Sequence, residues 1–175
     1  MQFIRNWRYG MCGLFIVVFA VGLPSLAEDW PQFLGSRRDG TYQGKALPKW
    51  PADGPKQLWK RNIGAGFAGP SVANGKLYLF HRRNGKEILE CMDAASGAEF
   101  WRERLDGEYS ASPILAAGRL YFCSRDGLTS VIRPGETFEL LGENRLDEGF
   151  MASPAVVGDA LILRTRTHVY RIEQQ

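Results

Sequence analysis

Cysteine and histidine are scarce in this chain. Three cysteines and two histidines occur among 175 residues, and the sequence has no C-x-x-C motif, no adjacent cysteine pair and no H-E-x-x-H motif. Thiol redox centres and many zinc sites depend on such spacings. His81 and His168 lie 87 residues apart, and we expect both to be surface or strand-end residues. The sequence therefore assigns no catalytic residue, no metal ligand and no cofactor-binding residue.

No apolar run is long enough for a membrane-spanning helix. The longest, Gly10–Leu23, has 14 residues, whereas a spanning helix needs about 20. It follows Arg5 and Arg8 and precedes a proline and small residues that end at Ala27, an order typical of export signals. We expect residues 1–27 to be a signal peptide cleaved after Ala27, with an uncleaved membrane anchor as the alternative.

A strong excess of either charge is also missing. The formal net charge is +3, and loss of the signal peptide with its two arginines leaves a nearly neutral mature chain. We therefore expect no nucleic-acid partner and no basic patch for anionic lipid. The one short basic cluster, His81-Arg82-Arg83, abuts Asn84-Gly85, which indicates a solvated hairpin tip.

Only Cys91 and Cys123 remain after removal of the signal peptide. Each lies inside an apolar run, ILECMD or LYFCS. Exported proteins can form disulfides, but a cysteine in such a run is commonly a buried free thiol. We expect two core thiols, with a disulfide as the alternative.

Glycine and proline, by contrast, are abundant, with 20 and 9 residues, which indicates frequent turns. Three similar segments recur, GFAGPSVANGKLYLF, EYSASPILAAGRLYFC and GFMASPAVVGDALILR, and their prolines Pro70, Pro113 and Pro154 are 43 and 41 residues apart. An aromatic residue precedes each proline: Phe67, Tyr109 and Phe150. A period just over about 40 residues with short strands is typical of a four-stranded β-propeller blade.

Each repeat divides into short strands separated by turns. In the first repeat the expected strands are SVA, KLYLF, EILECMDA and AEFWRERL, with turns at Asn74-Gly75, Asn84-Gly85 and Asp93–Gly97. Asn-Gly pairs, and Asp126-Gly127 in the second repeat, favour type I′ hairpins. Serines also recur in every repeat, at Ser71, Ser112 and Ser153, which indicates a structural role rather than a nucleophile.

The third repeat supplies only three strands, whereas Lys56–Ile63 precedes the first repeat and resembles a fourth strand. Trp59 in this segment lies 42 residues before Trp101, which is one repeat. We therefore expect the N-terminal strand to complete the C-terminal blade. The predicted fold is all-β, with about three four-stranded propeller blades in an incomplete or open propeller. Residues 56–175 form this repeat domain, preceded by a leader at 28–55.

Gly64, Gly66 and Gly69 spell G-x-G-x-x-G, a motif of dinucleotide-binding folds. That motif must follow a strand and open a helix. Pro70 and Asn74-Gly75 follow within a few residues and leave no room for a helix. We expect the glycines to belong to the loop that leads into the first strand of a blade, without a nucleotide.

These features resemble the PQQ-like β-propeller repeat. The SP-x-V-x-x-G-x-L-Y pattern, the D-A-A-S-G turn and the strand with an aromatic-tryptophan pair carry the resemblance, and the leader DWPQFLGSRRDG is similar to that of secreted bacterial BamB-like propellers. Within the leader, we expect Trp30, Trp50 and Arg38-Asp39 to tie it to the blades. Members of that family are longer, so the resemblance implies that the middle blades are missing near Leu105.

The resemblance implies a function without catalysis. Quinoprotein dehydrogenases with related repeats bind PQQ and calcium, but their ligands cannot be placed on this sequence. We expect a non-catalytic, periplasmic or secreted protein of the cell envelope that acts as a protein-binding or scaffold module. Its protein partner is unknown, with self-association as one option, and we expect no membrane span after signal cleavage. The alternatives are a remnant of a PQQ-dependent oxidoreductase and a truncated paralogue without independent function.

Overall fold

The computed structural model describes residues 29–173 apart from positions 45 and 48. The expected signal peptide at 1–27 lies outside these residues and stays a prediction, as do the boundaries of the leader. The described part of the chain contains eleven strands. It contains no helix that is long and apolar enough to cross a membrane.

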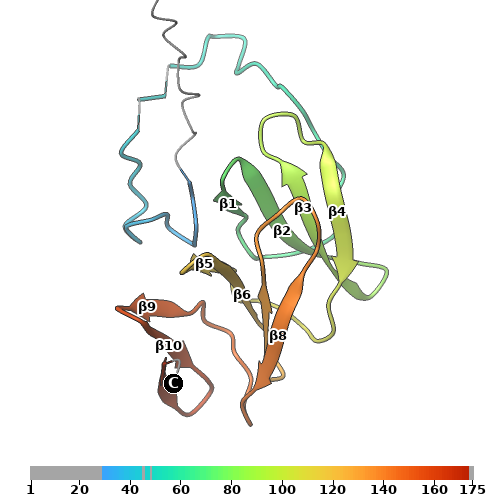
Figure 1. Cartoon of the computed structure of the whole chain (residues 1–175). Coiled ribbons are helices and arrows are strands. Elements are labelled where there is room, and N and C mark those ends of the chain that lie inside the picture. The colour runs from blue at the N-terminus through green and yellow to red at the C-terminus, as the bar shows by residue number, and fades with distance from the viewer. Residues whose placement is uncertain (1–28, 45, 48, 174–175) are drawn as a thin grey trace, which may run out of the picture.

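The strands form three antiparallel sheets, one for each repeat (Figure 1). The first sheet consists of β1 (Ser71–Ala73), β2 (Lys76–Arg83), β3 (Lys86–Asp93) and β4 (Glu99–Arg104). The second consists of β5 (Ile114–Ala116), β6 (Arg119–Cys123), β7 (Leu128–Ile132) and β8 (Leu140–Arg145). The third consists of β9 (Ala155–Val157), β10 (Ala160–Arg164) and β11 (Val169–Glu173). In each sheet the strands pair in sequence order, which confirms the predicted blades.

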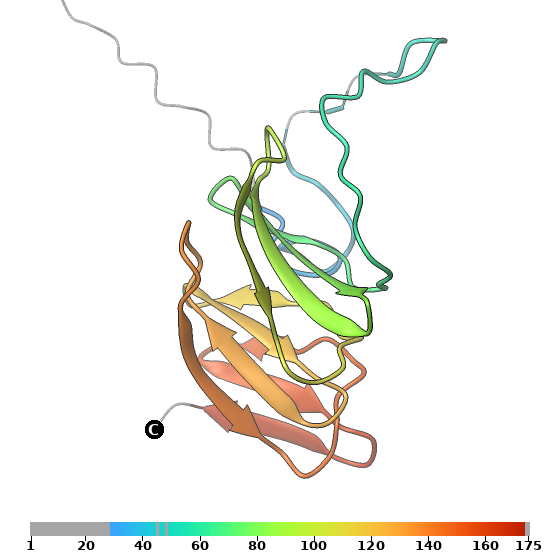
Figure 2. The same ribbon diagram turned by 90° about the vertical axis from the view of Figure 1, so that its right-hand side faces the viewer.

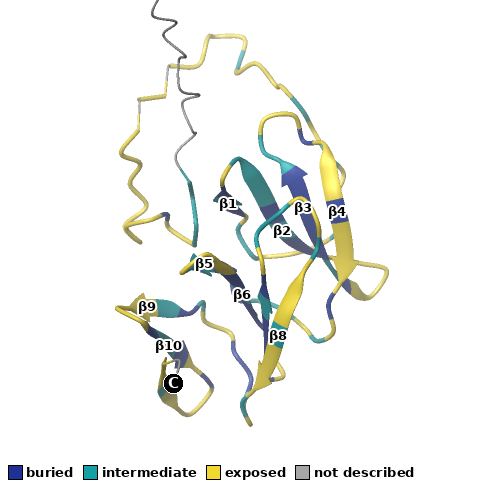
Figure 3. Cartoon of the chain, viewed as in Figure 1, coloured by how far each residue is buried: buried dark blue, intermediate teal, exposed yellow. Residues whose placement is uncertain are grey.

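The three sheets stack face to face in chain order, and the stack does not close on itself (Figure 2). The first strands β1 and β5 of neighbouring sheets lie next to each other. The outermost strands β4 and β8 are mostly exposed, whereas β3 and β6 are largely buried and β2 is buried in part (Figure 3). This arrangement is that of an open, incomplete propeller.

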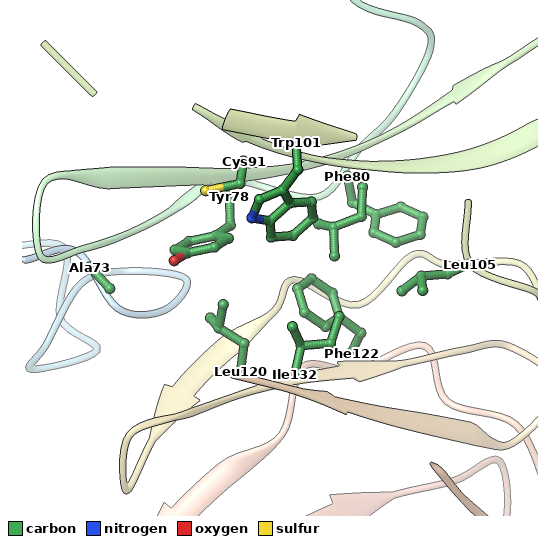
Figure 4. Packing of buried hydrophobic residues seen from close by; sticks show 10 residues of the cluster. Ala73, Tyr78, Phe80, Cys91, Trp101, Leu105, Leu120, Phe122 and Ile132 are labelled. Carbon is green, nitrogen blue, oxygen red and sulfur yellow. The ribbon is translucent and has the colours of Figure 1, made fainter. Parts of the chain in front are cut away.

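The largest core lies between the first and second sheets (Figure 4). Side chains alternate along a strand, so Tyr78 and Phe80 of β2 face the second sheet, where they meet Leu120 and Phe122 of β6. A smaller core between the second and third sheets includes Cys123, Ala111, Phe150 and Leu163. The second sheet therefore buries one face against the first sheet and the other against the third.

The turn between β7 and β8 locks the first two sheets together. Trp101 of β4 donates its Nε1–H to the carbonyl oxygen of Gly135 at 3.0 Å. The same tryptophan meets Phe138 edge to face, with 5.2 Å between ring centroids. This contact gives the tryptophan of the fourth strand its structural role.

The recurrent serines connect one sheet to the next. The N–H of Gly69 donates to Ser112 Oγ at 3.2 Å, and the N–H of Ser112 donates to Ser153 Oγ at 2.9 Å. Ser71 Oγ donates to the carbonyl of Pro113 at 3.2 Å. The prediction that these serines are structural is confirmed.

The two Asn-Gly hairpins have the expected backbone, but the Asp-Gly hairpin does not. Asn74, Asn84 and the glycine after each have positive φ, as a type I′ turn requires. At Asp126-Gly127 only the glycine does, with φ 90°. Because β6 ends at Cys123 and β7 begins at Leu128, this loop is too long for a two-residue turn.

The expected closure of the third blade by the N-terminal strand is wrong for this structure. Lys56–Ile63 forms no strand, and the third sheet has three strands among the described residues. The segment lies against the first sheet, where Trp59 Nε1–H donates to the carbonyl of Ala94 at 3.2 Å. The third sheet lies at the far end of the stack (Figure 2), so the segment cannot reach β11 of its own chain.

The leader runs across the inner strands of all three sheets. Trp30 pairs with Val72 of β1, the carbonyl of Pro31 accepts the N–H of Leu115 in β5 at 2.8 Å, and the Arg38 guanidinium donates to the carbonyl of Pro154 at 2.7 Å. The predicted ties at Trp30 and Arg38 are confirmed.

Two other leader ties that the sequence predicted are wrong. The Trp50 side chain is 73% exposed. Asp39 accepts hydrogen bonds from the backbone N–H and the hydroxyl of Thr41, so its carboxylate serves a local turn. Neither side chain has a hydrogen bond to a blade among the described residues.

Cys91 and Cys123 are buried free thiols, which confirms the prediction. Burial is the main cause that raises the pKa of each thiol to about 11. Cys91 faces the second sheet, and Cys123 lies in the core between the second and third sheets. Since they occupy different cores, they cannot pair with each other.

Candidate functional site

A cavity of about 230 Å³ opens at one end of the first two sheets. It lies between the loop that leads into β1 and the loop that leads into β5. Phe80 and Tyr109 form its apolar wall, with 4.3 Å between ring centroids. The Tyr109 hydroxyl donates to the carbonyl of Asp106 at 2.9 Å, which holds the second loop in place.

The glycine-rich loop at residues 64–69 packs closely against β2. A Cβ at Gly64 would lie 2.0 Å from the carbonyl oxygen of Arg82, and one at Gly66 would lie 3.1 Å from that of Phe80. Ala65 between them pairs with Arg82 through the backbone. The loop leads into β1, as expected, and no helix follows it in the described chain. Close packing therefore explains Gly64 and Gly66.

Charged side chains form a network at the mouth of this cavity. Arg82 lies between Glu87 and Glu108, at 3.2 and 3.0 Å, and Arg125 approaches the other oxygen of Glu108 at 3.5 Å. Burial raises the pKa of Glu87, although Arg82 opposes this effect. The cavity therefore combines an apolar wall with a rim of both charges.

His81 is buried, so its predicted place at the surface is wrong. The residue is 1% exposed. Its Nδ1 accepts the backbone N–H of Gly64 at 3.1 Å, and its Nε2 lies 3.3 Å from Glu90 Oε1. The alternation of side chains along β2 places His81 on the same face as Leu77 and Leu79, and this was the sequence signal for its burial.

Glu90 is the carboxylate that His81 faces. It is 1% exposed, and burial, the largest single effect, raises its pKa, but the hydrogen bond from Arg102 Nε at 2.6 Å, the contact with His81 and the charge of Arg102 together lower it. Arg61 approaches the second oxygen at 3.3 Å. The ion pairs therefore keep this buried carboxylate charged.

The aromatic residues that precede the prolines play two different roles. Tyr109 and Phe150 pack inward, and Phe150 is 1% exposed. Phe67 is one position closer to its proline and is 98% exposed beside the cavity. Met151, at the same distance from Pro154, is 65% exposed. The sequence signal that separates these roles is the spacing to the proline, which is three residues for Phe67 and four for Tyr109 and Phe150.

The described residues form no metal centre at the candidate site. No three His, Cys, Asp or Glu side chains come together as ligands in the part of the chain that the structure describes. His168 is exposed and lies 3.7 Å from Glu148 at the end of the third sheet, far along the chain from His81. The site is therefore best described as a surface with one exposed aromatic side chain and a charged rim.

Comparison with known proteins identifies the repeat. Residues 51–137 match the family model described as outer membrane protein assembly factor BamB. No curated protein matches the chain.

Solved structures of larger proteins are similar to part of the chain. One is a europium-containing methanol dehydrogenase, with 14% identity and a TM-score of 0.48 over 58% of this chain and 20% of that one. Another is BamB from Moraxella catarrhalis, with 10% identity and a TM-score of 0.41 over 62% of this chain and 46% of that one. The aligned part of this chain thus spans less than half the length of either protein.

Proposed function

Because the repeats of this chain belong to the PQQ-like β-propeller repeat family, we propose that the chain is a non-catalytic protein-binding module of the cell envelope. One observation carries the proposal: Phe67 is 98% exposed at the mouth of a charged cavity. An unburied phenylalanine ring is costly in water, and covering it on binding is favourable.

The surroundings of Phe67 support a protein ligand. Protein interfaces typically place aromatic side chains at the centre and polar groups at the rim. Here Arg82, Glu108 and Arg125 supply charged groups of both signs around the cavity. Met151, at the equivalent position of the third repeat, offers a second flexible apolar contact at the same end of the blades.

The residues present do not fit the quinone and calcium that the family name implies. Calcium sites need several carboxylate or carbonyl oxygens around one point. The innermost strands read SVA, ILA and AVV and carry no carboxylate. The inner edge of β1 is already paired with Trp30 of the leader. We therefore derive no catalytic step through this cofactor.

The envelope location belongs to the same proposal. It is supported by the expected signal peptide at residues 1–27 and by the family model, which describes an outer membrane assembly factor. A protein-binding module in that compartment would need an exposed docking surface, which the loop end of the blades offers.

Site-specific photo-crosslinking in cells tests the binding surface. A photo-reactive phenylalanine analogue replaces Phe67 in one variant and Ala95, exposed in the turn after β3 at the opposite end of the sheet, in the control. We expect one discrete crosslinked protein from position 67 and none from position 95. Equal crosslinking from both positions, or none from position 67, contradicts the proposal.

A substitution pair measures the contribution of the ring. Phe67→Ser should abolish co-purification of the crosslinked partner, whereas Phe100→Ser, at a 37% exposed phenylalanine of β4, should leave it unchanged. Retention of the partner by Phe67→Ser overturns the role of this surface.

The absence of catalysis has its own test. The purified chain is incubated with PQQ and calcium, passed through a desalting column and assayed for dye-linked alcohol oxidation. We expect no quinone absorbance in the protein fraction and no oxidation. Retained quinone with turnover would replace this proposal by the oxidoreductase alternative.

A further inference from the structure

The segment Lys56–Ile63 occupies the place of a fourth strand next to the first sheet. Trp101 of β4 donates its indole N–H to a carbonyl in the turn before β8, at 3.0 Å. Trp59 donates its indole N–H to the carbonyl of Ala94 in the turn before β4, at 3.2 Å. The first sheet thus receives from Trp59 the contact that the second sheet receives from Trp101.

This segment is firmly bound to its own chain. The Trp59 ring lies over Gly97, where a Cβ would come within 2.7 Å of the ring. Arg61 pairs with Glu99 at 2.6 Å and with the buried Glu90 at 3.3 Å. The segment nevertheless pairs with no strand among the described residues, and Leu58 is 74% exposed. The segment therefore lies in the position of an outermost strand without pairing to other strands among the described residues.

At the other end of the stack, the third sheet has an open strand edge. Strand β11 pairs only with β10 among the described residues, whereas the corresponding strands β3 and β7 also pair with β4 and β8. Val169 and Ile172 of β11 are 69% and 38% exposed. An open strand edge of this kind favours pairing with another strand.

The second sheet has an open space at the equivalent place. A cavity of about 590 Å³ lies over Val131 and Gly142. Gly142 pairs with Val131 in the way that Trp101 pairs with Cys91. In the first sheet, Trp101 and the following turn fill this position. In the second, the glycine leaves room for a strand alongside β11.

We propose that Lys56–Ile63 of one copy of this chain adds to the β11 edge of a second copy while it stays bound to its own first sheet. The same contact in reverse closes a ring of two copies. Such a ring has about six blades, within the range of about four to eight that propellers use. A contact between two different surfaces forms a closed ring only when the rotation from one copy to the next adds up to a full turn. Two copies supply a number of blades that a closed propeller can have.

The register of β3 with β4 gives the pairing in this composite blade. When Trp59 is aligned with Trp101, and β10 with β2 from the prolines that precede them, Trp59 lies opposite Arg171, and Arg61 lies opposite Val169. A guanidinium beside an indole is favourable, and neither pair places like charges together. The open edge and the docked segment are therefore compatible in charge.

Light scattering of the purified full chain at several concentrations tests the proposal. We expect twice the mass of one chain. Val169→Lys places a like charge opposite Arg61 and should weaken the dimer at least about tenfold. Leu140→Lys, at a 44% exposed position of the complete second sheet, should leave it intact. A monomer at all concentrations, or a dimer insensitive to Val169→Lys, overturns the proposal.

Disulfide trapping tests the pairing directly. Chains with Lys60→Cys are mixed with chains carrying Tyr170→Cys, because the register places these residues opposite each other. We expect a mixed covalent dimer on mild oxidation. Chains with Lys60→Cys mixed with Leu140→Cys should form none. Equal trapping of both mixtures, or none in the first, contradicts the strand exchange.

Discussion

Tyr78 and Gly135, 57 residues apart, join the first two sheets, because the Gly135 N–H donates to the Tyr78 hydroxyl oxygen at 3.0 Å. Trp101 donates to the carbonyl of the same glycine. Both backbone groups of Gly135 therefore find their partners on side chains of the preceding blade. The turn between β7 and β8 is thus held by the first sheet as well as by the hydrogen bond from the Arg133 N–H to the carbonyl of Glu139 at 3.0 Å.

Removal of this hydroxyl should destabilise the fold. Tyr78→Phe leaves the Gly135 N–H without its acceptor in a half-buried position, and we expect a loss of about 1 kcal/mol in the free energy of unfolding. Urea denaturation measures it. Tyr121→Phe at the equivalent position of the second repeat is the control, since the described chain gives that hydroxyl no hydrogen bond. Equal losses would contradict the role of the Tyr78–Gly135 bond.

Substitution of a loop glycine should show how much the close approach of the loop to β2 matters for stability. Gly64→Ala places a Cβ 2.0 Å from the carbonyl oxygen of Arg82, so the loop must shift, and we expect a loss of about 1–3 kcal/mol in stability. Gly142→Ala, whose Cβ meets nothing within 4 Å, should change stability by less than about 0.5 kcal/mol. Thermal unfolding compares the two variants. A stable Gly64→Ala chain would show that the close approach is dispensable.

Acid should remove the contribution that Glu148, at the end of the third sheet, makes to the stability of the fold. Hydrogen bonds from Thr167 and Thr165 lower the pKa of Glu148 from 4.5 to about 2. A carboxyl whose pKa is lower in the folded state stabilises the fold above its ordinary pKa, and this contribution is lost as the pH falls from about 4.5 to about 2.

The variant Glu148→Gln isolates this effect. We expect its urea midpoint to lie below that of the unsubstituted chain at pH 6, with the gap narrowing at pH 3. Measurements at both pH values check the sign. A gap that widens in acid would mean that the threonine contacts favour the protonated carboxyl.

The two thiols should react slowly in the folded protein. The pKa values of Cys91 and Cys123 are raised to about 11, mainly by burial, and only the thiolate is nucleophilic. We expect alkylation by iodoacetamide at pH 8 to be at least about 100-fold slower than after unfolding. Mass spectrometry of the peptides follows each cysteine separately. Rapid labelling of either one in the native chain would show that its core opens.

The strands were predictable because local signals agree with one another. The segments SVA, ILA and AVV became β1, β5 and β9 with the expected bounds, since β-branched or apolar runs end at turn residues. The two Asn-Gly turns followed for the same reason. The Asp126-Gly127 hairpin differed because its geometry depends on where the flanking strands end.

Tertiary partners were not predictable in this way. Lys56–Ile63 has the pattern of a fourth strand, and the pattern is the same whether its partner is near or absent. The exposure of Phe67 follows from its spacing of three residues to Pro70, which only a residue-by-residue comparison with the four-residue spacing of the other two repeats shows. His81 was misjudged because its basic neighbours Arg82 and Arg83 outweighed the alternation of β2.

The serine contacts between blades have an evolutionary consequence. Ser112 accepts a hydrogen bond from Gly69 of the preceding repeat, and its own N–H donates to the serine of the following repeat. The residue just before the proline therefore donates its N–H in the first two repeats, and the serine of the second and third repeats accepts; the first repeat has Gly69 at this position and offers no such hydroxyl. A gene that gains or loses one serine-bearing repeat creates two neighbours that already match, so the length of such a protein can change in single steps without a redesigned boundary.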